Sequence, residues 1–477
     1  MSAGLWTAFE AAAATGGALC ARGGDPDRWV AEEWAAHGLS IDTRTLAPGE
    51  LFVALTDARD GHDFVVNAFE RGASAALVAR APSNAPDGAP LLIVPDTLEG
   101  LRDLARAARL RNFGKRVAVT GSVGKTSTKE MLRAALGAIG RVHASDKSFN
   151  NHWGVPLTLA RMPMDADFGV FEIGMNHAGE ITPLTKIVAP HVAVITTIGD
   201  AHIEFLGSRE NIARAKAEIF LGLEKGGAAI LPIDNDHFGL LRDLASKAGV
   251  ARIVTFGEGK DADIRLRSYR GDAAGAEVEA SVFGEPLAFS LGAPGRHQAM
   301  NALAVIGAAR ALGASAARAS AGLKGLAAAT GRGAQSKVRL PGGAEVTILD
   351  ESYNANPTSM SAALALLGQL KPDRGGRRVA VLGEMLELGP AAAELHAGLL
   401  RPLLAAKVDA LYVAGALMSH LWDKAPPAVR AERAADARAL APAIIDGLKD
   451  GDIIMVKGSN ASKVSEIVAA IKAAASA

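Results

Sequence analysis

Short apolar runs, each followed by a segment of helical spacing, fill the middle of the chain. The runs are "RVAVTG", "FGVFEIG", "VAVITTIG", "AAILPID" and "ARIVTFG", between residues 116 and 257. Continuous apolar strands that alternate with helices are typical of a parallel sheet covered on both faces. The pattern therefore predicts a central α/β domain with a mostly parallel sheet.

Two further patterns follow this segment. Residues 264–291 alternate apolar and polar positions between turn glycines, which predicts an antiparallel meander. Beyond a helix at 297–312 and a glycine-rich break at 331–333, strands and helices alternate again at "VTILD", "RRVAVLG", "DALYVAG" and "DIIMVKG". The second alternation predicts a smaller, Rossmann-like doubly wound unit.

The first hundred residues contain shorter apolar runs, "ELFVAL", "AALVAR" and "PLLIVP", and end in an arginine-rich helical stretch at 98–111. A joint is expected at "NFGK", residues 112–115. We therefore expect an α/β protein of three domains: a small N-terminal domain at 1–112, a central domain at 113–337 and a C-terminal domain at 338–477. The length of 477 residues agrees with about 150 residues per domain.

Composition narrows the class of protein. Lys plus Arg and Asp plus Glu both number 51, so the overall charge gives no reason to expect a nucleic-acid partner. The longest uncharged run, 352–370, contains asparagine, proline and glutamine, and we expect no membrane insertion. A single cysteine, Cys20, excludes an internal disulfide and a cysteine metal cluster. The N-terminus shows no export signal, which favours the cytoplasm.

The stretch "VTGSVGKTSTKE", residues 119–130, indicates a nucleotide site. It follows a strand and opens a helix, so backbone N–H groups would point at anionic oxygens. Lys125 would add a positive charge and Thr126 a hydroxyl for magnesium. Val119 stands where the standard phosphate loop has its first glycine, and the alternative is a tight turn with a surface lysine. The predicted ATP contacts here are Thr120, Gly121, Ser122, Val123, Gly124, Lys125, Thr126 and Ser127.

Two candidate metal ligands lie at the end of one expected strand of the central domain and just after the next strand in the sequence. Glu172 lies in "VFEIGMNHAGE" and His202 in "IGDAHIEFLGS". Both fall on the carboxyl edge of the predicted sheet, where the phosphate loop also lies and where ligands bind. A carboxylate and an imidazole there could hold a magnesium ion. Alternatively, Glu172 pairs with a cation and His202 caps a loop.

Several blocks in order resemble the Mur ligases, the amide-bond-forming enzymes of peptidoglycan synthesis, which are similar to folylpolyglutamate synthases. Besides the phosphate loop, they are "SFNNHWGVPLTL", "FEIGMNHAGEI", "HIEFLGS", "AKAEIF" and "GRHQAMNALA". "IDTRTLAPGELFVAL" resembles the UDP-sugar module of the last two ligases of the pathway. "LDESYNANPTSMSAAL" and "VLGEMLELG" resemble the member that adds D-alanyl-D-alanine.

The resemblance implies a bacterial, cytoplasmic enzyme, expected as a monomer, that joins D-Ala-D-Ala to UDP-MurNAc-tripeptide through an acyl phosphate. ATP and two Mg²⁺ ions are the implied cofactors. Lys125, Glu172, His202 and Lys216 are the implied catalytic residues, with Thr126, Glu172, His202 and Lys216 around the metals. Lys216 would act as a carbamate; without the resemblance, a lysine in "NIARAKAEIF" would be assigned as a solvated charge.

Further binding residues are expected in the same blocks and, for Arg332, at the joint between the second and third domains. Asn301, with His297 as a weaker candidate, is expected at the adenine, although both residue types are also ordinary at a helix start. The other nucleotide candidates are Arg332, Asp350 and Glu351. The substrate candidates are Thr43, Arg44, Asn150, Asn151, His152, Tyr353, Asn354 and Asn356. Asp60, Gly61 and His62 form a second loop in the first domain whose role can be structural only.

Three alternatives remain. One is a diaminopimelate- or lysine-adding ligase of the same family, and the second is a folylpolyglutamate synthase-like ligase. The third is a phosphate-loop protein that hydrolyses nucleotide without ligation. One departure from the resemblance occurs in "VKGSNASKVSEIV", where Asn460 and Ser462 replace an arginine and a methionine common in the family. The sequence does not specify the third residue of the tripeptide.

Overall fold

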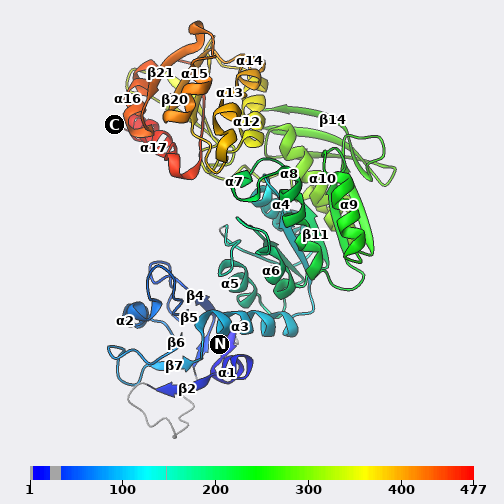
Figure 1. Ribbon diagram of the computed structural model, residues 1–477, viewed down its shortest axis with the longest axis vertical. Helices are drawn as coiled ribbons and strands as arrows, with labels where there is room; N and C mark the ends of the chain where they lie inside the picture. The colour runs from blue at the N-terminus through cyan, green and yellow to red at the C-terminus, as the bar shows by residue number, and fades with distance from the viewer. Residues whose placement is uncertain (1–3, 22–33, 147, 477) are drawn as a thin grey trace.

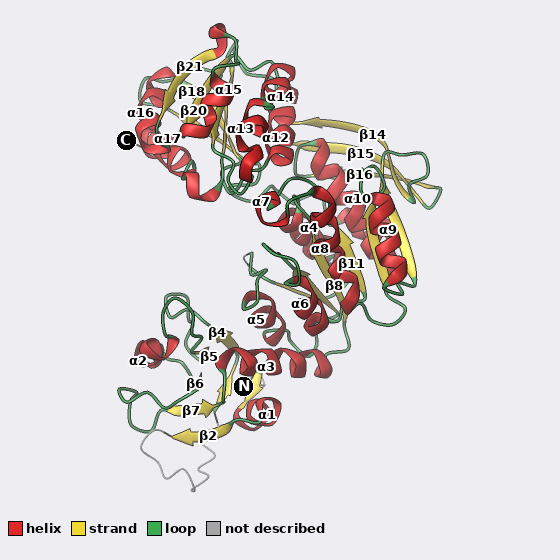
Figure 2. Cartoon of the chain, in the orientation of Figure 1, coloured by secondary structure: helices red, strands yellow, loops and turns green. Residues whose placement is uncertain are grey.

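The structure is a computed structural model that describes residues 4–21, 34–146 and 148–476. Figure 1 shows three bodies in chain order, with the N-terminal residues at the lower end and the C-terminal residues at the upper end. Each body contains its own sheet flanked by helices, as Figure 2 shows. The predicted α/β class with mostly parallel sheets is confirmed.

The first body is built on a five-stranded sheet of order β2-β7-β6-β5-β4. β2 pairs antiparallel with β7, and the other neighbours are parallel. A separate two-stranded ribbon joins β1 to β3. The elements are β1 (Trp6–Thr7), α1 (Ala8–Thr15), β2 (Ala18–Ala21), β3 (Ala35–Ala36), β4 (Gly38–Ser40), β5 (Glu50–Val53), α2 (Val65–Glu70), β6 (Ala75–Val78), β7 (Pro90–Ile93) and α3 (Thr97–Arg111).

The central body carries a nine-stranded sheet of order β16-β15-β14-β13-β12-β11-β8-β10-β9. Its strands are parallel from β9 to β14, and β14 to β16 form the predicted antiparallel meander at one edge. The elements are β8 (Lys115–Thr120), α4 (Lys125–Gly137), β9 (Val142–Ala144), α5 (Gly154–Ala160), β10 (Phe168–Glu172), α6 (Ile181–Val188), β11 (Val192–Ile195), α7 (Ile203–Leu206), α8 (Arg209–Ala217), β12 (Ala228–Pro232), α9 (Phe238–Lys247), β13 (Arg252–Gly257), β14 (Ile264–Asp272), β15 (Gly275–Val282), β16 (Glu285–Leu291), α10 (Arg296–Ala311) and α11 (Ala316–Ala321).

The third body has a six-stranded sheet of order β17-β18-β22-β19-β20-β21. β17 spans the expected domain limit at 337/338 and pairs antiparallel with β18, so residues from 334 belong to this sheet. The elements are β17 (Ala334–Arg339), β18 (Glu345–Asp350), α12 (Pro357–Gln369), β19 (Arg378–Gly383), η3 (Gly389–Ala391), α13 (Ala392–Ala397), α14 (Leu400–Ala405), β20 (Ala410–Ala414), α15 (Ser419–Trp422), β21 (Arg430–Ala434), α16 (Ala437–Gly447), β22 (Ile453–Lys457) and α17 (Ser465–Ser476).

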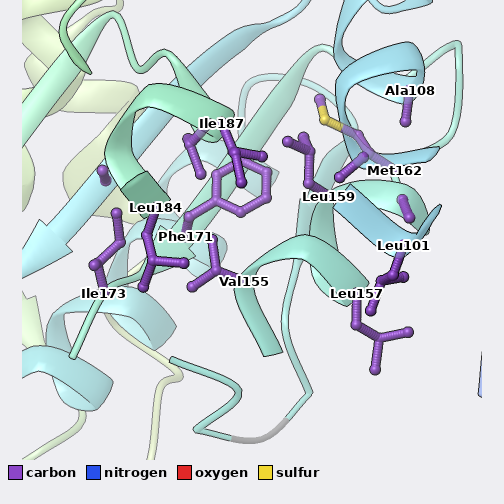
Figure 3. Close-up of a cluster of buried hydrophobic side chains, with 14 of the residues drawn as sticks. Leu101, Ala108, Val155, Leu157, Leu159, Met162, Phe171, Ile173, Leu184 and Ile187 are labelled. Carbon is purple, nitrogen blue, oxygen red and sulfur yellow. The ribbon is translucent and has the colours of Figure 1, made fainter. Parts of the chain in front are cut away.

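The first and central bodies share one hydrophobic core. Figure 3 shows Leu101 and Ala108 of α3 beside Leu157 of α5 and Met162. All four side chains are buried, and the same cluster continues into the central sheet through Phe171. Burying one leucine side chain contributes about 1.5–3 kcal/mol. The first body is therefore anchored to the central one by apolar packing.

The third body has its own apolar clusters and meets the central body through fewer side chains. Among the described residues, Ile203 of α7 is the central-body side chain that packs against a third-body cluster. Polar contacts also cross this joint, for example Gln335 Nε2 donating to the carbonyl of Ala273 at 3.1 Å. Interfaces that are small and polar allow relative domain motion. We therefore expect the third body to move relative to the central one.

Candidate nucleotide and substrate site

The loop between β8 and α4 depends on two glycines. Gly121 has φ 150°, and a Cβ there would lie 1.9 Å from Thr196 Oγ1. Gly124 has φ 85°, and a Cβ there would lie 2.8 Å from Asn301 Oδ1. No side chain caps the start of α4, so the first N–H groups of the helix remain directed at the loop. A helix N-terminus of this kind binds phosphate.

Lys125 is the first residue of α4, and its Nζ donates to the carbonyl of Gly121 at 2.8 Å. Burial lowers the pKa of Lys125, Glu172 opposes that shift, and Arg332 adds to it. The amine is thus held across the loop, close to further charged groups. This is the position from which a lysine contacts the β- and γ-phosphates of a nucleotide.

Glu172 ends β10 and is 2% exposed. Its Oε2 accepts from Thr126 Oγ1 at 2.8 Å and its Oε1 accepts from Asn150 Nδ2 at 2.7 Å. A carboxylate and a hydroxyl are therefore held together beside the phosphate loop. Such hard oxygen donors are the ligands that Mg²⁺ prefers, so this pair fits a magnesium ion next to a phosphate.

Lys216, on α8, is 1% exposed. Burial and the positive charge of Lys125 lower its pKa well below the ordinary value. Burial also lowers the pKa of His202, and the charges of Lys125 and Lys216 act in the same direction. Three basic side chains thus converge here, and the site would be stabilised by anions.

The third body and the joint that precedes it supply the opposite wall of the cleft. The guanidinium of Arg332 lies 3.9 Å from the centre of the Tyr353 ring, and its Nη2 donates to Ser148 Oγ at 3.5 Å. Lys457 of β22 is buried, lies 3.3 Å from Glu351 Oε2 and donates to the carbonyl of Asn354 at 2.9 Å. The cleft between the two bodies has a volume of about 530 Å³.

A second cavity of about 860 Å³ lies between the first and central bodies. Thr43 and Arg44 line it from the first body, and Asn151 lines it from the central body. Arg44 is exposed and forms a 2.7 Å ion pair with Asp42. Ser148 lines both this cavity and the nucleotide cleft. One continuous substrate could therefore extend from the first body to the phosphate loop.

Comparisons with known proteins cover nearly the whole chain. Three family models match: "Mur ligase family, catalytic domain" at residues 35–116, "Mur ligase middle domain" at 119–309 and "Mur ligase, glutamate ligase domain" at 338–460. A UDP-N-acetylmuramoyl-tripeptide–D-alanyl-D-alanine ligase from Bacillus subtilis is 36% identical over 92% of this chain and 93% of the relative. The ligase of that name from Escherichia coli is 35% identical over 91% and 93%.

The chain belongs to the Mur ligase family.

Solved structures agree with that assignment. A crystal structure of MurF from Acinetobacter baumannii superposes with a TM-score of 0.84 at 30% identity, covering 98% of this chain and 99% of that one. A MurF ligase from Thermotoga maritima in complex with ADP gives a TM-score of 0.77 at 27% identity, covering 92% and 98%. The resemblance to Mur ligases and the three-domain α/β fold are both confirmed.

In this Mur ligase most of the site residues predicted from the sequence line the nucleotide cleft. The predicted residues that line it are Ser122, Val123, Gly124, Lys125, Thr126, Ser127, Asn150, Glu172, His202, His297, Asn301, Arg332, Glu351, Tyr353, Asn354 and Asn356. Asn150 and Asn151, adjacent in sequence, face different cavities. The roles of all these predicted residues stay predictions.

Some predicted residues do not line the cleft, among them Gly121 and the buried Lys216. Thr120 is fully buried at the end of β8. Asp350 is 4% exposed, and its Oδ2 accepts from the backbone N–H of Gly331 at 3.0 Å while Oδ1 accepts from Ser352 Oγ at 2.6 Å. These bonds hold the segment before β17 against the end of β18. His152 is exposed beside Trp153 and lines neither cavity described above.

The loop of Asp60, Gly61 and His62 is held by its own contacts. Asp60 Oδ1 accepts from the backbone N–H of His62 at 3.0 Å, and the neighbouring Arg80 and His62 hold the pKa of Asp60 far below its usual range. His62 Nε2 accepts from the backbone N–H of Ala79 at 2.8 Å. These bonds support a structural role for Asp60 and His62. Gly61, in contrast, lines the cavity between the first and central bodies.

The sequence reasoning missed several residues of the cleft. Ser148, Gln298 and Lys457 line it, and none was a predicted site residue. The sequence could have indicated Lys457, because it ends a strongly apolar strand and precedes a glycine, as ligand-binding residues at strand ends often do. Ser148 and Gln298 had no signal beyond their place in recognised blocks. Among the described residues, no group of three His, Cys, Asp or Glu side chains could hold a metal ion unaided.

Proposed function

We propose that this Mur ligase joins D-alanyl-D-alanine to UDP-N-acetylmuramoyl-tripeptide at the expense of ATP, giving the pentapeptide, ADP and phosphate. The names of the curated relatives support this substrate pair. The observation that carries the proposal is that Ser148 lines both the nucleotide cleft and the cavity between the first and central bodies. A nucleotide-sugar peptide held in that cavity would present its terminal carboxylate to the phosphate loop.

The reaction would proceed in two steps. A carboxylate oxygen of the tripeptide attacks the γ-phosphorus of ATP, the bond from that phosphorus to the β–γ bridging oxygen breaks, and ADP leaves. The amine of D-Ala-D-Ala then attacks the acyl carbon, the carbon–oxygen bond to phosphate breaks, and the amine loses a proton. Phosphoryl transfer of this kind depends mainly on alignment and charge neutralisation.

The residues of the cleft would supply those two requirements. The loop amides and Lys125 would hold the β- and γ-phosphates, and Asn301, which packs against Gly124, would lie near the base. Arg332, stacked on Tyr353, would bring a positive charge from the domain joint. Because the third body closes one wall of the cleft, its docking would exclude water from the acyl phosphate.

We also propose Mg²⁺ at this site, held by Thr126, Glu172, His202 and Lys216. The ions would neutralise phosphate charge and polarise the acyl carbonyl that the amine attacks. The support is that the hydroxyl of Thr126 and the carboxylate of Glu172, 2.8 Å apart, are hard oxygen donors of the kind that magnesium prefers. Two Mg²⁺ ions are expected. The proposed location of the enzyme is the cytoplasm of a bacterium. Among the described residues, no helix is long and apolar enough to cross a membrane.

Carbamylation of Lys216 is part of the same proposal. A buried lysine whose pKa is lowered by burial and by Lys125 is more readily neutral, and a neutral amine is the form that reacts with carbon dioxide. Carbamylation would convert one of three converging cations into an anion suited to a metal. The support is the burial of Lys216 together with its place in the "AKAEIF" block.

The test is phosphate release by purified protein with ATP and UDP-MurNAc-tripeptide, with and without D-Ala-D-Ala, coupled to mass analysis of the nucleotide product. We expect pentapeptide formation and phosphate release that require the dipeptide. Equal release without it, and no pentapeptide, would favour a nucleotide hydrolase. Parallel reactions with diaminopimelate and lysine tripeptides would determine the accepted third residue.

A further inference from the structure

A side chain of the third body contacts the candidate metal ligand His202 of the central body. Glu387 lies in the loop between β19 and η3, and its Oε2 is 2.6 Å from His202 Nδ1. The oxygen lies off the direction required for a well-aligned Nδ1–H hydrogen bond. Contacts in ligand-free active sites are often misaligned in this way and tighten when the substrate binds. A small rotation of the ring would align the pair.

The backbone on both sides of this contact is strained and fixed. His202 has φ 63° and Glu387 has φ 61°, a left-handed conformation that is uncommon for residues other than glycine. The backbone N–H of Glu204 donates to the carbonyl of Glu387 at 3.2 Å. A Cβ on Gly389 would lie 3.3 Å from Glu204 Cα, so the two loops approach closely. Strain of this kind persists only where surrounding contacts impose it.

An imidazole that binds a metal through one ring nitrogen usually donates a hydrogen bond from the other. The partner fixes the tautomer and the ring orientation. With Nδ1 beside Glu387, Nε2 is the nitrogen left for the cleft that His202 lines. The partner carboxylate comes from a different body, so the ring can be fixed in this way only while the third body is docked.

We propose that Glu387 is a positioning residue that fixes the tautomer and orientation of His202, so that the site on the central body is complete only when the third body is docked. This inference rests on the proposed role of His202 in the ligase. It explains how domain docking and assembly of the phosphate-transfer site are linked through one side chain.

Four variants separate this role from a structural one. Glu387→Ala removes the acceptor, Glu387→Gln keeps an oxygen acceptor without the charge, and Glu387→Gly removes the acceptor while relieving the left-handed strain. Glu204→Gln is the matched control, because Glu204 is an exposed acid in the same contact region whose side chain makes no described bond to His202. A structural role alone predicts that the glycine variant is fully active.

The first readout is ¹⁵N NMR of the histidines in ligand-free protein, with His202→Asn to assign the signal. We expect His202 to carry its proton on Nδ1 in the wild type and in Glu387→Gln. A shift toward the Nε2–H tautomer is expected in Glu387→Ala and Glu387→Gly. An unchanged His202 signal in the alanine and glycine variants would overturn the proposal whether or not the protein is a ligase.

The second readout is steady-state ligation at varied Mg²⁺. Loss of a hydrogen-bond partner of a metal-bound histidine typically costs 10- to 100-fold, and we expect a kcat decrease of about that size in Glu387→Ala and Glu387→Gly. The Mg²⁺ concentration for half-activation should rise, Glu387→Gln should fall between, and Glu204→Gln should match the wild type. Wild-type ligation with unaffected variants would refute this inference alone, whereas a wild type that forms no pentapeptide would refute the proposed function.

Discussion

Replacing Lys216 by methionine should make the protein more stable and abolish ligation. The side chain is 1% exposed, and its pKa is lowered by burial and by Lys125, with no carboxylate among the causes. An ammonium there is therefore poorly compensated. Burying a polar group without adequate compensation costs roughly 1–3 kcal/mol in protein mutational data. Methionine has a similar length and needs no such compensation, so the variant should recover stability on this order.

The assay is native-state hydrogen exchange of the α8 amides at pH 7 in buffer free of carbon dioxide and nucleotide. Local measurement is required because a chain of three domains need not unfold in one step. We expect slower exchange in Lys216→Met by the equivalent of about 1–3 kcal/mol, together with loss of pentapeptide formation. Lys225→Met, at an exposed lysine of the same body, is the control and should change neither quantity.

The reasoning would be refuted in either of two ways. A Lys216→Met protein destabilised by more than about 1 kcal/mol would show that the ammonium is well compensated in the fold. A variant that still forms pentapeptide at the wild-type rate would show that the amine has no part in the chemistry. Added bicarbonate should raise wild-type ligation at limiting carbon dioxide and leave the variant unaffected.

Two further predictions concern the phosphate loop and a half-buried histidine. Gly121→Ala would place a Cβ 1.9 Å from Thr196 Oγ1, so we expect ATP binding weakened at least about 10-fold in calorimetry, or about 1.4 kcal/mol. His191 Nδ1 accepts from the backbone N–H of Arg116 at 3.1 Å, and burial, Arg116 and Lys115 lower the pKa of His191 to about 4. The folded state then binds fewer protons than the unfolded state between about pH 6.5 and 4, so wild-type stability falls as pH drops through this window. After allowance for solvent screening, His191→Asn should remove roughly 1–2 kcal/mol of that fall, measured by native-state hydrogen exchange of the β8 and β11 amides at pH 7.5 and 4.5.

Each of these predictions has a matched comparison. Gly137 lies in α4, has no atom within 4 Å of an added Cβ and has no positive φ, so Gly137→Ala should bind ATP normally. Equal ATP affinity in Gly121→Ala and Gly137→Ala would contradict the close-approach argument. Parallel stability curves for wild type and His191→Asn between pH 7.5 and 4.5 would contradict the account of His191.

The sequence predicted the elements that have a strong local signal. The apolar runs at 116–120 and 168–172 became β8 and β10, and the strand-loop-helix context of Lys125 was sufficient to place the phosphate loop. β9 was not predicted, because a strand as short as Val142–Ala144 carries too little periodicity. β17 was not predicted either, because its partly exposed positions at the sheet edge leave no apolar run.

Contacts between segments that are distant in the chain could not be predicted from the sequence. Glu387 meets His202, and Lys457 meets Glu351, only because separate loops converge at the carboxyl edges of the sheets. Asp350 shows the converse: its strand-end position suggested a ligand contact, but its carboxylate is occupied by backbone and hydroxyl donors. Strand ends indicate where a site forms, and the packing of loops determines which side chains reach it.

The fate of the carboxylate oxygens tests most directly the claim that ATP activates the tripeptide carboxylate. UDP-MurNAc-tripeptide carrying ¹⁸O in both oxygens of its terminal carboxylate would be reacted with unlabelled ATP and D-Ala-D-Ala, and both products analysed by mass spectrometry. The account predicts one ¹⁸O in the released phosphate and one in the new amide carbonyl, for each pentapeptide formed. Phosphate without ¹⁸O, released while pentapeptide accumulates, would contradict it.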